Sequence, residues 1–226
     1  QGRGHARDDG QERAPDRDGQ RLEEGVGVGL DALEARLGRE VAALVESKDA
    51  QKEGGQLQGF VDDDVDLHDT TVMGYPVLGD VDWLSQQPNL FFAIAIGDGA
   101  TRHTIAKQLS GTDVQPTALR HASVSIHRTT SVGRGTILCE GAAPTVHIRI
   151  GAHTVLDQHC TVGHDSTIGD FVTVHPGARI SGNVHLETGV TMGAGSVVLP
   201  NTRIGAHSTV GAGAVVTDDL PPHCTA

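Results

Sequence analysis

Aliphatic residues recur at every sixth position through the second half of the chain. From residue 150 onward the series is unbroken and comprises Ile150, Leu156, Val162, Ile168, Val174, Ile180, Leu186, Met192, Val198, Ile204, Val210 and Val216. The same phase extends back to Leu138, Val132 and Ile126, with one interruption at Pro144. A six-residue period with one inward aliphatic position is typical of short strands wound into a triangular prism. The pattern predicts a mainly β fold, a left-handed parallel β-helix of about five coils over residues 118–226.

The remaining hexad positions carry small, β-branched or glycine residues. Two positions before the aliphatic ones stand residues such as Val172, Ala178, Val184, Val190, Ser196 and Ala214. Glycine often follows the aliphatic position, because the corners of a prism need residues that tolerate positive φ. Cys160 occupies the small slot before Val162. We therefore expect Cys160 to lie in the core and not to act as a nucleophile.

The first half of the chain has a different organisation. Residues 1–35 form an atypical segment with few apolar residues, of which 1–21 are expected to be disordered. Residues 36–117 alternate helical and strand patterns, which predicts a small α/β domain built on a parallel sheet. Its expected elements are a helix that includes Leu37 to Val45, strands at 57–61 and 90–96, an extended segment at 74–80 and a helix at 100–109.

Composition narrows the partners and the location. The 226 residues include 29 acidic and 17 basic ones, a formal charge of −12. This charge disfavours nucleic acid as a partner, because phosphate binding needs a basic surface. No apolar run has transmembrane length and no signal peptide opens the chain, so membrane insertion is not expected. Three scattered cysteines without paired spacing favour a reducing, cytoplasmic setting.

Among the 13 histidines, His164 has a neighbour that suits it to acid–base chemistry. Asp165 follows it directly, and a carboxylate beside an imidazole can hold it as a base. Adjacent residues of a regular strand point to opposite faces, so Asp165 can assist His164 only if the chain bends between them. A hexad corner provides such a bend.

Four stretches together resemble one family. They are FVDDD at 60–64, GYPVLGD at 74–80, FAIAIGD at 92–98 and GHDSTIGDFVTVHPGARISGNVHLETGVTMGAGSVVLP at 163–200. In order and spacing they are similar to bacterial sugar acetyltransferases of the sialic acid O-acetyltransferase and UDP-amino-sugar N-acetyltransferase type. This family belongs to the hexapeptide-repeat acyltransferase superfamily, and the resemblance covers roughly residues 37–221.

The resemblance implies an acetyltransferase that moves acetyl from acetyl-CoA, as co-substrate, to an amino or hydroxyl group of a sugar or nucleotide-linked sugar. It implies that His164 is the general base and Asp165 the acidic neighbour that increases its basicity. It places acetyl-CoA between two protomers of a homotrimer, at Thr173, Gly182, Ala194 and Ala212. It assigns the sugar substrate to Asp62, Asp63 and Gly97.

One departure from the family concerns the start of the α/β domain. Family members open with a strand and a glycine-rich turn before the first helix, whereas DALEARL at 31–37 predicts neither. We therefore expect a Rossmann-like domain that lacks its first strand and glycine-rich turn. A reading-frame error upstream of about residue 37 is one hypothesis for this departure.

Two alternatives stay open. His159 and His164 are five residues apart, a spacing used by the zinc ligands of γ-class carbonic anhydrases, which share the hexapeptide fold. A third ligand would be needed about two coils upstream, where Ser123 stands, with His121 and His127 nearby. We expect no metal in the acetyltransferase. The second alternative is an inactive scaffold.

Overall fold

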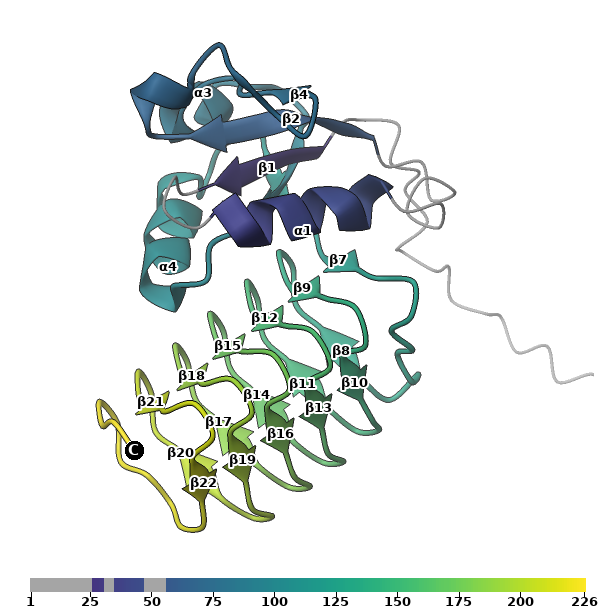
Figure 1. Ribbon diagram of the computed structural model, residues 1–226, viewed down its shortest axis with the longest axis vertical. Helices are drawn as coiled ribbons and strands as arrows, with labels where there is room; N and C mark the ends of the chain where they lie inside the picture. The colour runs from purple at the N-terminus through teal and green to yellow at the C-terminus, as the bar shows by residue number, and fades with distance from the viewer. Residues whose placement is uncertain (1–25, 31–34, 47–55) are drawn as a thin grey trace, which may run out of the picture.

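The computed structural model describes residues 26–30, 35–46 and 56–226. Within these residues the chain forms a small α/β domain and a β-helix, which lie against each other (Figure 1).

Strands and helices alternate in the α/β domain, as the sequence predicts. The elements are β1 (Val26–Leu30), α1 (Ala35–Glu46), β2 (Leu57–Asp62), η2 (Val65–Leu67), β3 (Thr71–Val72), β4 (Tyr75–Pro76), α3 (Val81–Ser85), β5 (Phe91–Ile94), α4 (Gly99–Gln108) and β6 (Gln115–Pro116). Among the described residues, four parallel strands form one sheet in the order β2-β1-β5-β6. The predicted helices and strands of this domain are confirmed.

The prediction that this domain lacks its first strand is wrong. Val26–Leu30 forms β1, which pairs in parallel with β2 on one side and β5 on the other. The sequence VGVGL gives little local strand signal, because glycine at alternate positions weakens strand propensity. Backbone pairing with two strands from later in the chain supplies what the local sequence lacks. The expected loss of the glycine-rich turn and the expected disorder of 1–21 concern positions outside the described residues.

The β-helix consists of two-residue strands that pair in parallel with the strands one coil away. They are β7 (Leu119–Arg120), β8 (Ser131–Val132), β9 (Ile137–Leu138), β10 (Ala143–Pro144), β11 (Arg149–Ile150), β12 (Val155–Leu156), β13 (Thr161–Val162), β14 (Thr167–Ile168), β15 (Thr173–Val174), β16 (Arg179–Ile180), β17 (His185–Leu186), β18 (Thr191–Met192), β19 (Val197–Val198), β20 (Arg203–Ile204), β21 (Thr209–Val210) and β22 (Val215–Val216). Over residues 119–216, all of which are described, these strands form three sheets. The first sheet runs from β7 to β21, the second from β8 to β20 and the third from β10 to β22.

The aliphatic ladder is the core of the prism. From Leu156 to Val210 each member of the sixfold series is at most 2% exposed. Pro144, the one interruption, occupies the same inward slot and pairs with Val162. Cys160 is fully buried, as predicted, and burial raises the pKa of its thiol to about 12. The predicted hexad phase is therefore confirmed.

The turns between strands stack into three edges of the prism. The His164 edge contains 146–147, 164–165, 182–183 and 200–201; the Phe171 edge contains 152–153, 170–171, 188–189 and 206–207; the Ala194 edge contains 158–159, 176–177, 194–195 and 212–213. Left-handed φ values occur at the second turn position, as at His147 (55°), Asp165 (61°) and Asn183 (56°). Histidine, aspartate and asparagine adopt this conformation as well as glycine. The expectation that the glycines directly after the aliphatic positions supply the positive φ is wrong: Gly163, for example, has no left-handed φ, and a Cβ there would stand 2.4 Å from the backbone nitrogen of Gly182 in the next coil.

The α/β domain packs on one face of the prism, the sheet that contains β9, β12 and β15. Helix α1 lies between the parallel sheet and this face (Figure 1), and its Val41 and Val45 share one apolar cluster with Ile137 and Val155. The same face runs between the Phe171 edge and the Ala194 edge. The His164 edge is therefore the edge opposite the α/β domain.

Candidate active site

His164 and Asp165 form a hydrogen-bonded pair at an exposed corner. They occupy the two turn positions between β13 and β14, and the left-handed φ of Asp165 turns its side chain toward His164. Nδ1 of His164 donates to Oδ2 of Asp165 at 2.8 Å. The hydrogen bonds from His164 and then from His147 lower the pKa of the Asp165 carboxyl. The bend that this pairing needs is thus present.

The pairing fixes which nitrogen of His164 is free to accept a proton. An ionised carboxylate only accepts hydrogen bonds, so Nδ1 carries the hydrogen and Nε2 carries the lone pair. Gly182, one coil further on, lies under the ring: a Cβ built on Gly182 would stand 2.7 Å from Nε2 of His164. The absence of a side chain at Gly182 therefore leaves room for the imidazole.

The other expected acetyl-CoA positions fall in two places. Ala194 and Ala212 are exposed and follow each other one coil apart on the Ala194 edge. Thr173, by contrast, is only 1% exposed, and its hydroxyl donates to the carbonyl oxygen of Gly97 at 2.7 Å. Its side chain thus joins the β-helix to the α/β domain.

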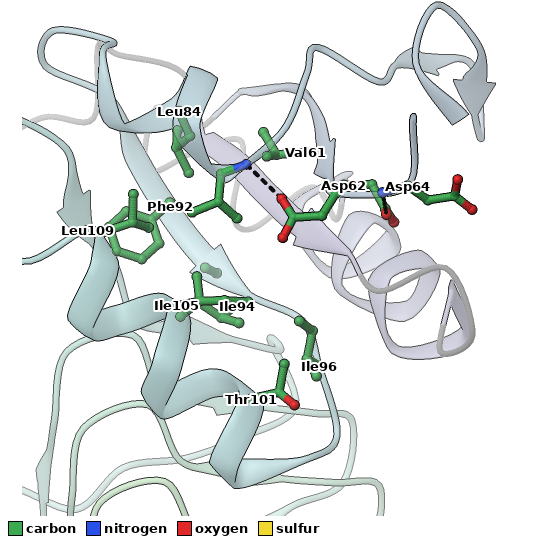
Figure 2. Close-up of a pocket in the computed structure, with 13 residues that line it drawn as sticks. Val61, Asp62, Asp64, Leu84, Phe92, Ile94, Ile96, Thr101, Ile105 and Leu109 are labelled. Atoms are coloured by element: carbon green, nitrogen blue, oxygen red, sulfur yellow. Dashed lines mark hydrogen bonds between the residues drawn. The ribbon is translucent and has the colours of Figure 1, made fainter. Parts of the chain in front are cut away.

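The expected sugar-binding residues lie at the carboxyl end of the parallel sheet, beside a cavity of about 200 Å³. Figure 2 shows apolar side chains of β5 and α4, such as Phe92 and Ile105, facing the acidic residues that end β2. In open parallel sheets, ligands bind at this end of the strands. Gly97 follows β5, but it does not line the cavity; its carbonyl oxygen faces the β-helix.

Both acidic residues also order the chain around the cavity. Asp62 is 2% exposed, and its Oδ1 accepts the N–H of Asp64 at 2.8 Å. Asp63 Oδ1 accepts the N–H of Val81 at 3.1 Å, at the start of α3. A carboxylate there satisfies a donor that the helix itself leaves unpaired.

The buried Arg102 of α4 is a residue that sequence reasoning missed. It is 1% exposed and donates to the carbonyl oxygens of Ile96, Gly97, His153, Phe171 and Val172 at 2.7–3.0 Å. Arg102 therefore fastens α4 and the end of β5 to the Phe171 edge. Its acceptors on the β-helix lie 51 to 70 residues after Arg102 in the chain, so no local sequence pattern predicts these hydrogen bonds.

His153 fills the same junction. Its ring stacks on Phe171, with 5.3 Å between centroids and an interplanar angle of 1°, and it also faces Phe92 at 6.4 Å. Burial, reinforced by the Arg102 charge, lowers the pKa of His153. This histidine thus belongs to the domain junction and not to the acid–base site.

The second residue that sequence reasoning missed is His147. Its Nδ1 lies 3.2 Å from Oδ1 of Asp165, the oxygen that His164 does not use. His147 stands 18 residues before Asp165, which is three hexads or one coil. That spacing was available in the sequence as a signal.

The histidine spacing considered for zinc does not bring the two residues together. His159 lies on the Ala194 edge, whereas His164 lies on the His164 edge. Strand β13 runs between these two edges of the prism, so the two histidines do not meet. Among the described residues, no three metal-ligating side chains converge. No helix in the described ranges is long and apolar enough to cross a membrane.

Similarity to known proteins covers both parts of the chain. Residues 37–109 match the PglD N-terminal domain family, and residues 147–182 match the bacterial transferase hexapeptide family of six repeats. The GDP-perosamine N-acetyltransferase of Escherichia coli O157:H7 is 30% identical in an alignment of 163 residues that covers 71% of this chain and 73% of that protein.

Solved structures agree over nearly the whole length. WeeI from Acinetobacter baumannii AYE superposes with a TM-score of 0.78 at 32% identity, covering 88% of this chain and 94% of WeeI. A mutant perosamine N-acetyltransferase from Caulobacter crescentus, in complex with CoA and GDP-perosamine, superposes with a TM-score of 0.80 at 25% identity, covering 89% and 92%. The chain belongs to the bacterial sugar acetyltransferases of the hexapeptide-repeat superfamily, which join a PglD-type N-terminal domain to a β-helix.

Proposed function

We propose that this protein transfers the acetyl group of acetyl-CoA to the amino group of a nucleotide-linked sugar, with His164 as the general base. The observation that carries the proposal is the His164–Asp165 pair at 2.8 Å, on a chain whose relatives act on GDP-perosamine or are solved with CoA and GDP-perosamine. The amino acceptor follows those relatives, which are N-acetyltransferases.

The reaction needs one proton to be moved twice. The sugar nitrogen attacks the thioester carbonyl carbon, and Nε2 of His164 accepts the N–H proton as the C–N bond forms. When the tetrahedral intermediate collapses, the C–S bond breaks and the imidazolium returns the proton to the departing thiolate. Asp165 stabilises the imidazolium between these steps. Cys160 takes no part, since its thiol is buried in the core.

The acetyl-CoA site that we propose runs over the small residues Gly182, Ala194 and Ala212. Gly182 lies beneath the base, while Ala194 and Ala212 lie on another edge of the same prism. Such residues let an extended ligand approach the backbone closely. Thr173 does not line this acetyl-CoA site, because its hydroxyl donates to the carbonyl oxygen of Gly97 at the domain junction instead of facing solvent.

The nucleotide-sugar site that we propose is the cavity at the end of β2 and β5, with Asp62 and Asp63 at its acidic side. The apolar side chains of Phe92 and Ile105 suit a flat base, and the acidic loop suits its N–H donors. Gly97 contributes by fixing the chain between β5 and α4.

A homotrimer would complete the active site. Within one chain His164 lies on the edge of the prism opposite the face that carries the α/β domain, so a single chain does not bring the proposed base to the proposed sugar cavity. Packing of prisms side by side would bring the His164 edge of one protomer to a neighbour's α/β domain. A cytoplasmic location fits the cofactor and the three cysteines, which lack paired spacing.

Mixed oligomers test this arrangement. His164→Ala lacks the base, whereas Asp63→Arg disrupts the sugar cavity, so each variant alone is expected to be inactive. Refolding the two together should restore acetyl transfer from acetyl-CoA to a GDP-linked amino sugar, measured by mass spectrometry of the product. The matched GDP-linked sugar with a hydroxyl in place of the amine should not react. Inactivity of the wild-type protein with both sugars would overturn the proposed function, and failure of the mixture alone would overturn the shared site.

A further inference from the structure

The carboxylate of Asp165 is shared by two imidazoles. Oδ2 accepts from Nδ1 of His164 at 2.8 Å, and Oδ1 accepts from Nδ1 of His147 at 3.2 Å. His147 occupies the second turn position of the preceding coil, directly in line with Asp165. Among the described residues, these two histidines are the side chains whose hydrogen bonds lower the pKa of this carboxyl.

His147 is itself held in place from the coil before it. Its backbone N–H donates to Oγ1 of Thr129 at 2.9 Å, and that hydroxyl is hydrogen-bonded to Nδ1 of His127 at 2.8 Å. The next residues of the column, Asn183 and Asn201, continue with an amide hydrogen bond of 2.8 Å to each other. One column of polar side chains thus runs along the His164 edge and meets the base at Asp165.

An exposed aspartate needs such a second partner to stay in one orientation. The Asp165 side chain is 53% exposed, so water competes for both of its oxygens. A donor on Oδ1 fixes the plane of the carboxylate and leaves Oδ2 aimed at Nδ1 of His164. The carboxylate in turn fixes the orientation and tautomer of the His164 ring. Loss of the hydrogen bond from His147 to Asp165 is therefore expected to lower activity without changing any contact with the substrate.

We propose that His147 is a positioning residue for acetyl transfer, which holds Asp165 for His164 and, when protonated, competes with His164 for the same carboxylate. The inference rests on the proposed function, because it requires His164 to be the base. His147 touches neither substrate nor the reacting atoms, so its effect belongs in kcat and in the pH profile and not in KM.

Two replacements separate the hydrogen bond from the charge. His147→Asn keeps a hydrogen-bond donor, because Nδ2 of asparagine is as many bonds from the backbone as Nδ1 of histidine. Asparagine also suits the left-handed φ of this corner, as Asn183 (56°) and Asn201 (65°) of the same column show. His147→Ala removes the donor. We expect kcat within about twofold of wild type for His147→Asn and a loss of about tenfold for His147→Ala, with KM for acetyl-CoA unchanged in both.

The pH profile gives a readout that a merely structural role would not move. In His147→Asn the positive charge that a protonated His147 places beside Asp165 is gone, while a hydrogen-bond donor persists. The acidic limb of kcat/KM should therefore shift to higher pH. His159→Asn is the matched control, since His159 has the same φ of 55° at a corner on another edge; its profile should equal that of wild type.

The outcomes distinguish the two claims. Wild-type activity in His164→Ala would overturn the proposed function. A dead His164→Ala together with wild-type kcat and an unshifted acidic limb in both His147 variants would overturn this inference alone. Equal losses in His147→Asn and His147→Ala, with lower melting temperatures and no shift of the limb, would also overturn it, because His147 would then serve only the fold.

Discussion

Gly182 lies beneath the imidazole of His164, so closely that a Cβ at Gly182 would stand 2.7 Å from Nε2 and 2.8 Å from Cε1 of the ring. Gly182→Ala should therefore push the proposed base out of line. We expect kcat to fall about 10²-fold, the effect of misplacing a reacting group by about 1 Å. Steady-state kinetics, together with an unchanged melting temperature, check this prediction.

A double-mutant cycle shows whether Gly182 acts through His164. Gly182→Ala should have no further effect in a His164→Ala background, because the group that it displaces is absent. Additive losses from the two changes would mean that Gly182 contributes by another route, such as direct contact with acetyl-CoA.

The phase of the β-helix can be tested within one strand. Ile168 points inward and is 1% exposed, whereas its neighbour Thr167 points outward. Ile168→Asp places a charge without a partner among aliphatic side chains and should destabilise the fold by about 4 kcal/mol or more. Thr167→Asp should change stability by about 0.5 kcal/mol at most, since it lies between Arg149 and His185 of the adjacent strands. Equal urea midpoints for the two variants would show that the phase is wrong.

The periodic part of the fold was predictable because its signal is local and repeated. Each hexad carries its own inward residue, so the predicted inward positions were correct even across the interruption at Pro144. The strand β1 was not predictable, since its glycine-rich sequence becomes a strand only between β2 and β5. Arg102 was beyond prediction for the same reason, because its acceptors come from distant turns. His147 was within reach, since the interval of 18 residues to Asp165 is one coil.

Arg102 should be essential for docking of the two domains. Arg102→Met keeps the apolar length of the side chain but leaves several buried carbonyl oxygens without their donor. We expect a loss of about 3 kcal/mol or more in the free energy of unfolding. Arg102→Lys should also destabilise, because a single ammonium cannot reproduce the planar fork of donors. Lys107→Ala, at an exposed position on the same helix, is the control and should leave the melting temperature unchanged.

His153 should make the fold sensitive to mild acid. Its pKa is lowered by burial, so below a pH of about 6.5 the unfolded chain takes up a proton that the folded protein resists. Stability is thus full above that pH and declines as the pH falls. His153→Phe should flatten the decline between about pH 6.5 and pH 5, where ordinary carboxyl groups do not yet titrate. The equivalent position one coil later is Phe171, with φ of 57° against 52° at His153, so the ring fits the corner.

Thermal unfolding of wild type and His153→Phe at a series of pH values measures this difference. An equally steep decline in both proteins would assign the acid sensitivity to other groups.

Single-turnover acetyl transfer by His164→Ala tests the central claim most directly. The acetyl-CoA complex of the variant is mixed with a GDP-linked amino sugar, and formation of the acetylated product is followed by rapid quench. A positioned general base contributes about 10²–10⁴-fold, so the rate constant should fall by that factor while calorimetry finds the Kd for acetyl-CoA unchanged. Asp165→Asn should lose less, because it alters the base without removing it. A His164→Ala rate constant equal to that of wild type would contradict the assignment of His164 as the base.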